Sequence, residues 1–231
     1  MKAVIHQPQY FPYPGFFHKL TEADIFVILD NTQYDQRFSN RNKILTSTGV
    51  SWITVPIDKH QHFKLNKDVE IFNLPWKEKH LKSILYSYSK SKFFDNYFEF
   101  FKKFYEKEWK FLIDLNITSL IKIIEFLGIK INIMRESEIN VKGKSTERLV
   151  NICKNIGADT YISGKGLPGK KYMDEEMFEK NGIRLEFNNY KPVAYDQNFT
   201  DEFVPNLSII DMLFNVGPDS LKLIKNSKYI N

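Results

Sequence analysis

The sequence predicts a single α/β domain over residues 1–231, built on a Rossmann-like, mostly parallel sheet with helices on both faces and a helical insertion in the middle of the chain. Three observations predict it. Short apolar or β-branched runs alternate with helical patterns, glycines repeatedly separate a helix from the strand that follows, and residues 76–128 are predominantly helical. Alternation of this kind is typical of parallel βαβ units.

The segments on either side of the insertion supply the expected strands, each a short apolar run bounded by polar, glycine or proline residues. We expect strands at residues 3–5, 25–29, 51–56, 68–71, 129–134, 160–163 and 183–187. A helix follows the loop after the first strand. Further helices are expected at residues 144–156 and 174–181, each ended by a glycine, and over residues 208–214.

Within the insertion, apolar and aromatic side chains recur at helical spacing. Residues 76–88 repeat them at four-residue intervals behind Pro75, which suits a first helical turn. An aromatic stripe over residues 94–105 predicts a second helix. Residues 116–127 predict a third, which ends at Gly128.

Composition and charge exclude several classes of protein. A hydrophobic content of 42% excludes a disordered chain. The net charge of +5 comes from lysines interleaved with acidic residues, so no nucleic acid is expected as a partner. The lone Cys153 excludes an internal disulfide, suits a reducing compartment and has the spacing of a buried helix face. Because we find no secretory signal and no apolar run of about 20 residues, we expect a cytoplasmic protein without membrane insertion.

The first two strands each run into a loop that is rich in ligand-binding side chains. His6 and Gln7 follow the first strand, and Asp30, Asn31 and Gln33 follow the second. Ligands of open α/β sheets bind at the carboxyl ends of the strands, in the crevice that such loops form. The sequence therefore predicts a binding site between these two loops.

Two histidines and an arginine are the candidates for chemistry near these loops. At least one of His6 and His18 is expected to move a proton or bind a ligand, because imidazole titrates near neutral pH. The alternative is that His6 packs at a strand end and His18 lies on a helix surface. Arg41 offers a fork for phosphate and Asn42 an amide for sugar hydroxyls, although turn chemistry also explains both residues.

A glycine loop follows the strand at residues 160–163. Its first residues are Ser163, Gly164 and Lys165, and such a loop lets backbone amides and a lysine approach a phosphate. It is not a P-loop, because the required Gly-Lys-Ser/Thr spacing is absent. Elsewhere His60 and His62 lack the further ligands of a metal site, so no metal is expected.

Segments along nearly the whole chain resemble the WbqC-like family, which is found among bacterial genes for O-antigen and other surface polysaccharides. These are residues 6–19, 23–24, 30–34, 41–44, 52–56, 161–164 and 208–217. The chain departs from the family pattern at Tyr13, where tryptophan is usual, and at Asn31, where a second aspartate is usual. The second departure argues against a mechanism that needs two adjacent carboxylates.

The resemblance implies a cytosolic enzyme of O-antigen (lipopolysaccharide) biosynthesis that acts on a nucleotide-activated sugar. We expect a transferase that moves an acyl or aminoacyl group to the amino group of an amino-sugar nucleotide. A CoA thioester or ATP is the candidate co-substrate, and a homo-oligomer the candidate assembly. The catalytic residues would be His6, His18 and Asp30, and the substrate-binding residues Gln7, Tyr10, Asn31, Gln33, Arg41, Asn42, Ser163, Gly164 and Lys165.

Two other functions stay open. The first loop and the glycine loop also suit a nucleotidyltransferase-like enzyme that uses a nucleoside triphosphate. Alternatively, the chain is a non-catalytic partner of a polysaccharide assembly complex and presents the aromatic helices of residues 76–107 as a docking face.

Overall fold

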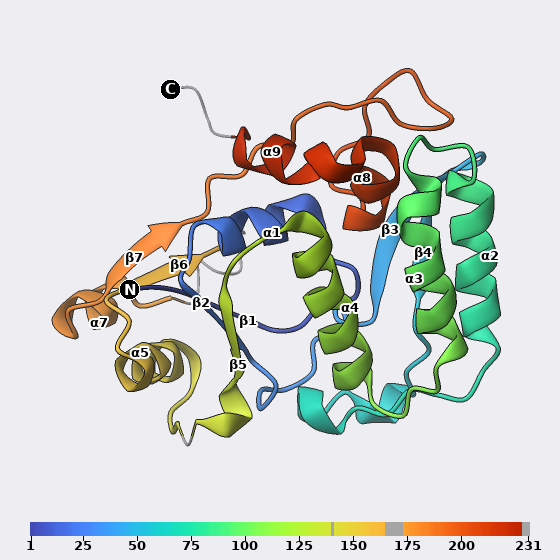
Figure 1. Cartoon of the computed structure of the whole chain (residues 1–231). Helices are drawn as coiled ribbons and strands as arrows, with labels where there is room; N and C mark the ends of the chain where they lie inside the picture. Colours follow the sequence, from blue (N-terminus) through green and yellow to red (C-terminus); the bar gives the residue numbers. More distant parts are fainter. Residues whose placement is uncertain (140, 165–172, 228–231) are drawn as a thin grey trace.

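The computed structural model describes residues 1–139, 141–164 and 173–227, and in that part of the chain the central sheet contains five parallel strands (Figure 1). Their order is β5-β2-β1-β6-β7. The strands are β1 Lys2–His6, β2 Ile25–Ile28, β5 Asn132–Arg135, β6 Thr160–Ser163 and β7 Arg184–Phe187. The sheet confirms the Rossmann-like α/β class that the sequence predicts.

The central strand of this sheet is β1, which is apolar on both faces. Ala3, Val4 and Ile5 are at most 2% exposed. Successive side chains of a strand point to opposite faces, so a strand that is covered on both sides must be apolar throughout. This explains why the inner residues 3–5 of β1 form an uninterrupted apolar run.

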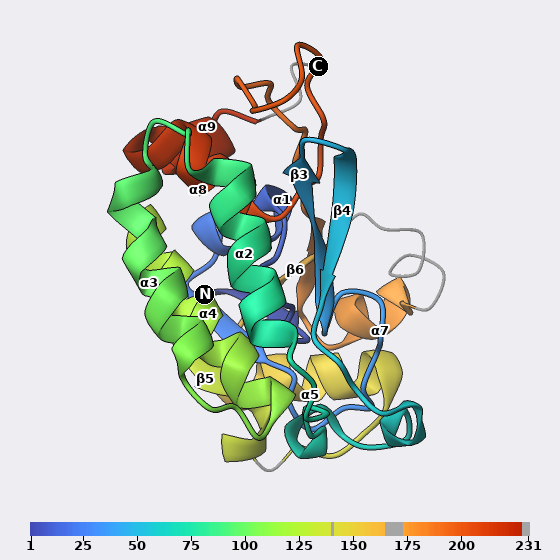
Figure 2. The ribbon, with the colours of Figure 1, turned by 90° about the vertical axis from the view of Figure 1, so that its right-hand side faces the viewer.

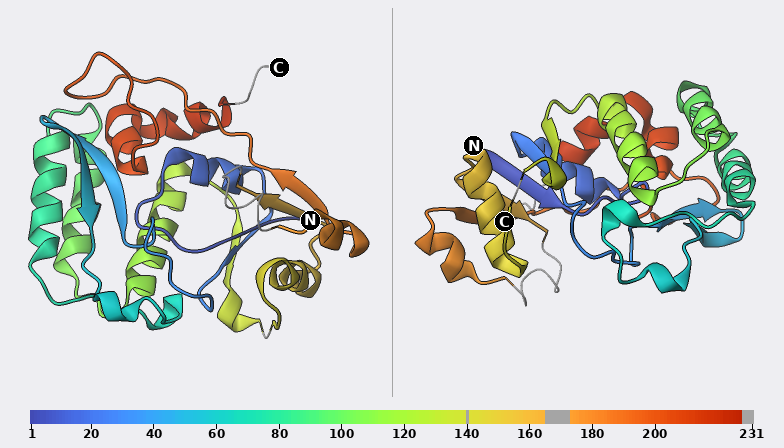
Figure 3. Two further views of the ribbon diagram at one scale, coloured as in Figure 1. Left: turned by 180° about the vertical axis from the view of Figure 1, so that it is seen from behind. Right: turned by 90° about the horizontal axis from the view of Figure 1, so that it is seen from below.

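Helices cover both faces of the sheet (Figures 1 and 3). One side carries α1 Pro14–Thr21, α4 Leu112–Leu127, α8 Ile209–Val216 and α9 Ser220–Lys225, and the other carries α5 Ser145–Ile156 and α7 Glu175–Lys180. The core is divided accordingly, because Val4 packs in the cluster that contains α1, and Ala3 and Ile5 pack in the cluster that contains α5. Cys153 is buried in the second cluster, as its spacing predicts.

The segment between β2 and β5 leaves the central sheet and builds a separate layer. It contains an antiparallel hairpin, β3 Arg41–Thr46 and β4 Gly49–Thr54, the short turns η1 Lys59–Gln61 and η2 Asn66–Asp68, and the helices α2 Trp76–Tyr88 and α3 Phe94–Glu106. Figure 2 shows the hairpin beside α2, with α3 on the far side of that helix. No helix in the described part of the chain is long and apolar enough to cross a membrane.

Several expected element bounds need correction in this layer. Arg41 and Asn42, expected in a loop, begin strand β3, because this segment pairs along its whole length with β4. Residues 68–71, expected as a strand, make only isolated bridges. The third inserted helix begins at Leu112 and not at residue 116, because Leu112 and Leu115 already belong to its buried face.

A buried carboxylate ties the C-terminal segment to the inserted helices. Asp211 of α8 is fully buried and accepts hydrogen bonds from Tyr88 of α2 at 3.0 Å, and from Tyr195 and Gln197 at 2.9 Å each. Burial raises the pKa of Asp211, while these hydrogen bonds favour its charged form. The rings of Tyr88 and Phe214 stack in the same interface, with their centroids 5.1 Å apart.

We predict that Asp211→Ala lowers the free energy of unfolding by about 2–4 kcal/mol, because three donors lose their common acceptor in the core. Urea denaturation followed by circular dichroism measures the loss. The matched control is Asp219→Ala, at an exposed position of the turn η4 Gly217–Asp219, which should change the free energy by less than about 0.5 kcal/mol. Equal losses in the two variants would contradict the structural role of Asp211.

Candidate functional site

A cavity lies where the order of the strands reverses. From β1 the chain passes to β2 and β5 on one side, and then crosses to β6 and β7 on the other. The loops after β1 and β6 therefore diverge, and in doubly wound sheets this switch point at the carboxyl ends of the strands is where ligands bind. The cavity has a volume of about 570 Å³, which is within the range of small-molecule sites.

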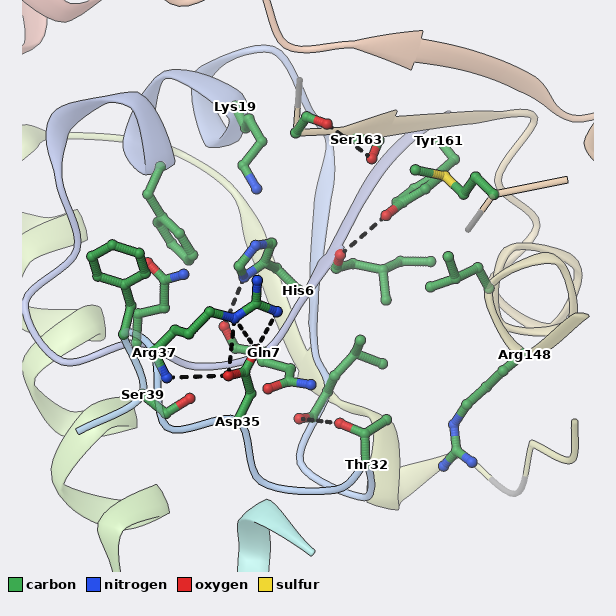
Figure 4. A pocket seen from close by; sticks show the side chains of 18 of the residues that line it. His6, Gln7, Lys19, Thr32, Asp35, Arg37, Ser39, Arg148, Tyr161 and Ser163 are labelled. Carbon is green, nitrogen blue, oxygen red and sulfur yellow. Dashed lines mark hydrogen bonds and ion pairs between the residues drawn. The ribbon is translucent and has the colours of Figure 1, made fainter. Parts of the chain in front are cut away.

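Segments that are far apart in the sequence line this switch-point cavity (Figure 4). The β1 end contributes Ile5, His6, Gln7 and Gln9; the α1 region Tyr13, Phe16 and Lys19; the loop after β2 Leu29, Thr32, Asp35, Arg37, Phe38 and Ser39; the start of α5 Ser145, Thr146, Arg148 and Leu149; and the β6 side Tyr161, Ser163, Gly164 and Met173. Apolar and aromatic walls with a few polar groups are typical of sites that bind small organic molecules.

The imidazole of His6 is neutral and presents a free electron pair. Its Nδ1 lies 2.8 Å from the carbonyl oxygen of Gln7, which can only accept, so Nδ1 carries the proton. Burial, with a further contribution from the positive charge of Lys19, lowers the pKa of His6 from 6.5 to about 3. The Nε2 atom is therefore unprotonated at neutral pH and can accept a proton or a hydrogen bond.

Lys19 places a buried amino group in the same cavity. It follows Phe16 by one turn of α1, so the two side chains lie on the same face of the helix. The residue is 3% exposed, and its Nζ lies 5.1 Å from the centre of the Phe16 ring. Burial lowers the pKa of Lys19 from 10.5 to about 7. In Figure 4 its amino group points toward the His6 ring.

The other charged side chains of the cavity wall have partners of opposite charge. Arg37 binds Asp35, with a distance of 2.7 Å between Nη2 and Oδ2. Arg148 of α5 binds Glu136, which lies in the turn η3 Glu136–Glu138, and donates to the carbonyl oxygen of Asn31 at 3.1 Å. By contrast, Nζ of Lys19 has neither a hydrogen-bond partner nor an ion-pair partner among residues 1–139, 141–164 and 173–227.

Four residues that the sequence predicts for the site line the cavity together: His6, Gln7, Ser163 and Gly164. The first two come from the end of β1 and the others from the end of β6, as expected for neighbouring parallel strands. Lys165 lies outside the described residues. Gln33 does not line the cavity, but its carbonyl oxygen accepts a hydrogen bond from Gln7 at 3.5 Å.

Asp30 and His18 are buried in hydrogen-bond networks outside the cavity wall. Asp30 accepts hydrogen bonds from Arg135 Nε at 2.7 Å and from the Ser137 hydroxyl at 2.6 Å. Burial opposes the charge of Asp30, but these hydrogen bonds outweigh it and lower the pKa of Asp30. His18 donates from Nδ1 to Asn188 at 2.6 Å and is 4% exposed, so it is not a helix-surface residue.

Three further predicted residues hold the loop and the hairpin in place. The exposed Arg41 stacks on Trp52, with 4.7 Å between the guanidinium carbon and the ring centre. Asn42 is buried and donates to the carbonyl oxygens of Tyr10 and Phe11. The Tyr10 hydroxyl binds Tyr105 and His80 in the core. Neither Arg41 nor Asn42 lies in the cavity with His6, because β3 pairs with β4 and not with the central sheet.

Lys19, Asp35 and Arg148 are cavity residues that were not predicted from the sequence. For Lys19 a signal existed, since it lies one helical turn after Phe16 in the first helix behind β1. A lysine on a short helix ordinarily indicates a solvated surface. Nothing in the local sequence reports that Lys19 is buried.

In the part of the chain that the structure describes, no group of three or more histidine, cysteine, aspartate or glutamate side chains could hold a metal ion. The exposed His60 and the half-buried His62 do not form such a group.

Comparisons with known proteins place the chain among relatives of similar length. The model of the WbqC-like protein family matches residues 7–223. A protein of Mycobacterium tuberculosis named "Uncharacterized protein Rv1507c" is 32% identical over 227 residues, which cover 96% of this chain and 97% of that protein. No solved structure is similar enough to this chain to count as a match.

We predict that Lys19→Met stabilises the protein at low pH. The pKa of Lys19 falls from 10.5 to about 7 on folding, so the unfolded chain binds more protons between these two values and the wild type gains stability as pH rises through this window. The gain from Lys19→Met should thus be full near pH 6 and vanish toward pH 10.5. Urea denaturation over this pH range measures it.

The matched control is Lys154→Met, which removes an exposed lysine from α5. Its difference from the wild type should stay small at every pH, because an exposed lysine loses little hydration on folding. A stability gain for Lys19→Met that does not change with pH would contradict the lowered pKa of Lys19 in the folded protein.

Proposed function

The chain belongs to the WbqC-like protein family, and we propose that it is a cytoplasmic transferase that acts on a nucleotide-activated sugar in the switch-point cavity. The proposed reaction is acyl or aminoacyl transfer to the amino group of an amino-sugar nucleotide, as a step of surface-polysaccharide (O-antigen) biosynthesis. The observation that carries this proposal is the neutral His6, which has an unprotonated Nε2 and lines a cavity of suitable size at the carboxyl end of β1.

Acyl transfer to an amine needs a group that removes a proton. With a CoA thioester as donor, the amine nitrogen attacks the carbonyl carbon, a carbon–nitrogen bond forms, and the carbon–sulfur bond breaks as the thiolate leaves with the electron pair. The nitrogen loses a proton, which His6 Nε2 accepts. Part of the shift that makes His6 a weak base comes from the charge of Lys19, so an anionic ligand that neutralises Lys19 would strengthen His6 as a base.

The walls of the cavity suit the remaining parts of such a substrate. Tyr13, Phe16, Phe38 and Tyr161 supply aromatic faces on which a nucleobase or sugar ring can pack. Asp30 and His18 support the site from outside, because their hydrogen bonds join the end of β2 to β5 and α1 to Asn188. We therefore assign them positioning roles.

Nucleotidyl transfer is the second candidate, and the surroundings of Gly164 favour it. Among the described residues, no atom lies within 4 Å of the place where a Cβ would stand on Gly164, so this part of the chain lets a phosphate approach the backbone there. This reaction would need a nucleoside triphosphate and release pyrophosphate.

A thermal-shift panel of nucleotides, amino-sugar nucleotides, CoA thioesters and ATP with magnesium separates these candidates. A ligand at about 100 times its dissociation constant adds roughly 2.7 kcal/mol of stability. A shift with amino-sugar nucleotides supports acyl transfer, and a shift with magnesium-ATP together with pyrophosphate release supports nucleotidyl transfer. A flat panel would contradict both and favour a non-catalytic partner of an assembly complex.

We predict that His6→Gln lowers kcat of acyl transfer by about 10²–10⁴-fold, because glutamine keeps a polar side chain but does not accept a proton. KM for the amino-sugar nucleotide should change little. Release of free thiol from the CoA thioester measures turnover. His60→Gln, an exposed histidine on η1, is the matched control and should keep wild-type turnover. Equal kcat values for His6→Gln and the wild type would contradict the assignment of His6.

A further inference from the structure

Among the described residues of the switch-point cavity, one charged side chain has no counter-charge. Lys19 is 3% exposed and lines the cavity, and its Nζ has only the Phe16 ring as a partner within the described part of the chain. Arg37 and Arg148 lie in the same wall but are neutralised by Asp35 and Glu136. When Lys19 is protonated, the cavity wall therefore carries a positive charge that the described part of the chain does not compensate.

An unpaired ammonium group in such a place is costly for the folded chain. Removing a charge from water costs several kcal/mol unless a partner of opposite charge compensates it. A lysine at a helix position that only packs against apolar groups could be replaced by methionine or leucine without loss. The uncompensated Lys19 therefore indicates that the partner is a ligand that enters the cavity.

We propose that the Lys19 ammonium is the anion receptor of the switch-point cavity, where it forms an ion pair with a phosphate group of the bound ligand. This inference deepens the proposed function and rests on it only in taking the same cavity as the ligand site. It restricts the ligand to phosphate-bearing molecules, such as nucleotide diphosphate sugars.

The position in the fold favours phosphate over carboxylate. Nucleotides bind doubly wound sheets with their phosphates at the carboxyl ends of the strands next to the switch point. Ser163 and Gly164 line the cavity at the end of β6, beside β1, and no described residue occupies the space within 4 Å of a Cβ position on Gly164. The Ser163 hydroxyl interacts with the Tyr161 side chain and makes a long contact of 3.5 Å to the Gly164 carbonyl oxygen, and it can exchange that long contact for a phosphate oxygen.

Binding should be coupled to proton uptake. Burial lowers the pKa of Lys19 to about 7, and an anion beside Nζ raises it again. Above pH 7 the amino group must therefore gain a proton as the phosphate binds, and affinity falls as pH rises. The titratable and charged groups that share the cavity wall with Lys19 are His6 on β1, Tyr13 before α1, Asp35 and Arg37 after β2, Arg148 on α5 and Tyr161 on β6.

Calorimetric titration with inorganic pyrophosphate tests the ion pair. A parallel titration with succinate tests whether a carboxylate binds as well as a phosphate. We expect the wild type to bind pyrophosphate more tightly than succinate, and Lys19→Met to weaken pyrophosphate binding by about tenfold or more. Lys154→Met, the control on α5, should bind like the wild type. A thermal melt of Lys19→Met near pH 7 verifies that the variant is folded.

A second measurement, by NMR, determines the pKa of Lys19 directly. In protein with ¹³C-labelled lysine Cε, one signal that is absent from Lys19→Met should titrate near pH 7 without ligand and at a higher pH with saturating pyrophosphate. A titration near the ordinary value of 10.5 in the free protein would overturn the inference, because Lys19 would then already have a counter-charge or full hydration.

The remaining outcomes are also decisive. Equal pyrophosphate binding by Lys19→Met and the wild type, no binding by the wild type, or tighter binding of succinate would each overturn the phosphate receptor. Lys19-dependent pyrophosphate binding without acyl transfer to any amino-sugar nucleotide would leave this inference intact and refute the proposed reaction. Acyl transfer by the wild type, together with unchanged substrate binding in Lys19→Met, would support the proposed reaction and refute this inference.

Discussion

Strand β1 pairs with β2 on one side and with β6 on the other, and the rest of the molecule depends on this central position. Because both faces of β1 are covered by helices, its three inner residues, Ala3, Val4 and Ile5, must be apolar. His6 is the last residue of β1. After β1 the chain adds strands β2 and β5 on one side of it and later strands β6 and β7 on the other, so the order of the strands reverses at β1. The same constraint that buries β1 thus opens the switch-point cavity and places His6 in it.

The layer built by β3, β4, α2 and α3 supports this arrangement without lining the cavity. Its hairpin and helices bury Tyr10 and Phe11, and Asn42 binds the carbonyl oxygens of both. These contacts fix the loop between β1 and α1. The loop in turn sets the start of α1, and hence the direction in which Lys19 points. A layer that contributes little to the cavity wall therefore determines the geometry of the site.

The cavity also concentrates groups that are unfavourable for folding. Lys19 loses hydration without gaining a partner in the described chain, and His6 is held neutral by burial beside that lysine. Elsewhere buried charges are well compensated, as Asp30 is by Arg135 and Ser137. Departures from the rules that stabilise a fold are expected at functional sites, because binding or catalysis requires groups that the ligand and not the protein satisfies.

Much of the fold could be predicted from local sequence. The apolar runs of β1, β2 and β6 and the glycines behind α4 and α5 identify parallel βαβ units, and His6, Gln7, Ser163 and Gly164 follow from the positions of the strand ends. Strand β3 was missed because Asn40-Arg41-Asn42 has the composition of a turn, and only pairing with β4 makes it a strand.

The chemistry of individual side chains was harder to predict, because it depends on tertiary contacts. Asp30 and Asn42 have the residue types of a binding loop, but their partners Ser137 and Tyr10 turn them inward. Lys19 has the residue type of a surface helix, but its face of α1 is covered by the cavity wall. Sequence position thus indicated where the site lies, and packing determined which residues form it.

A crystal structure of the protein soaked with an amino-sugar nucleotide tests the central claim most directly. The account predicts the ligand in the switch-point cavity, with a phosphate oxygen about 3 Å from Lys19 Nζ and the sugar amine within hydrogen-bond reach of His6 Nε2. A ligand bound elsewhere, or one in the cavity with its phosphates turned away from Lys19, would contradict it.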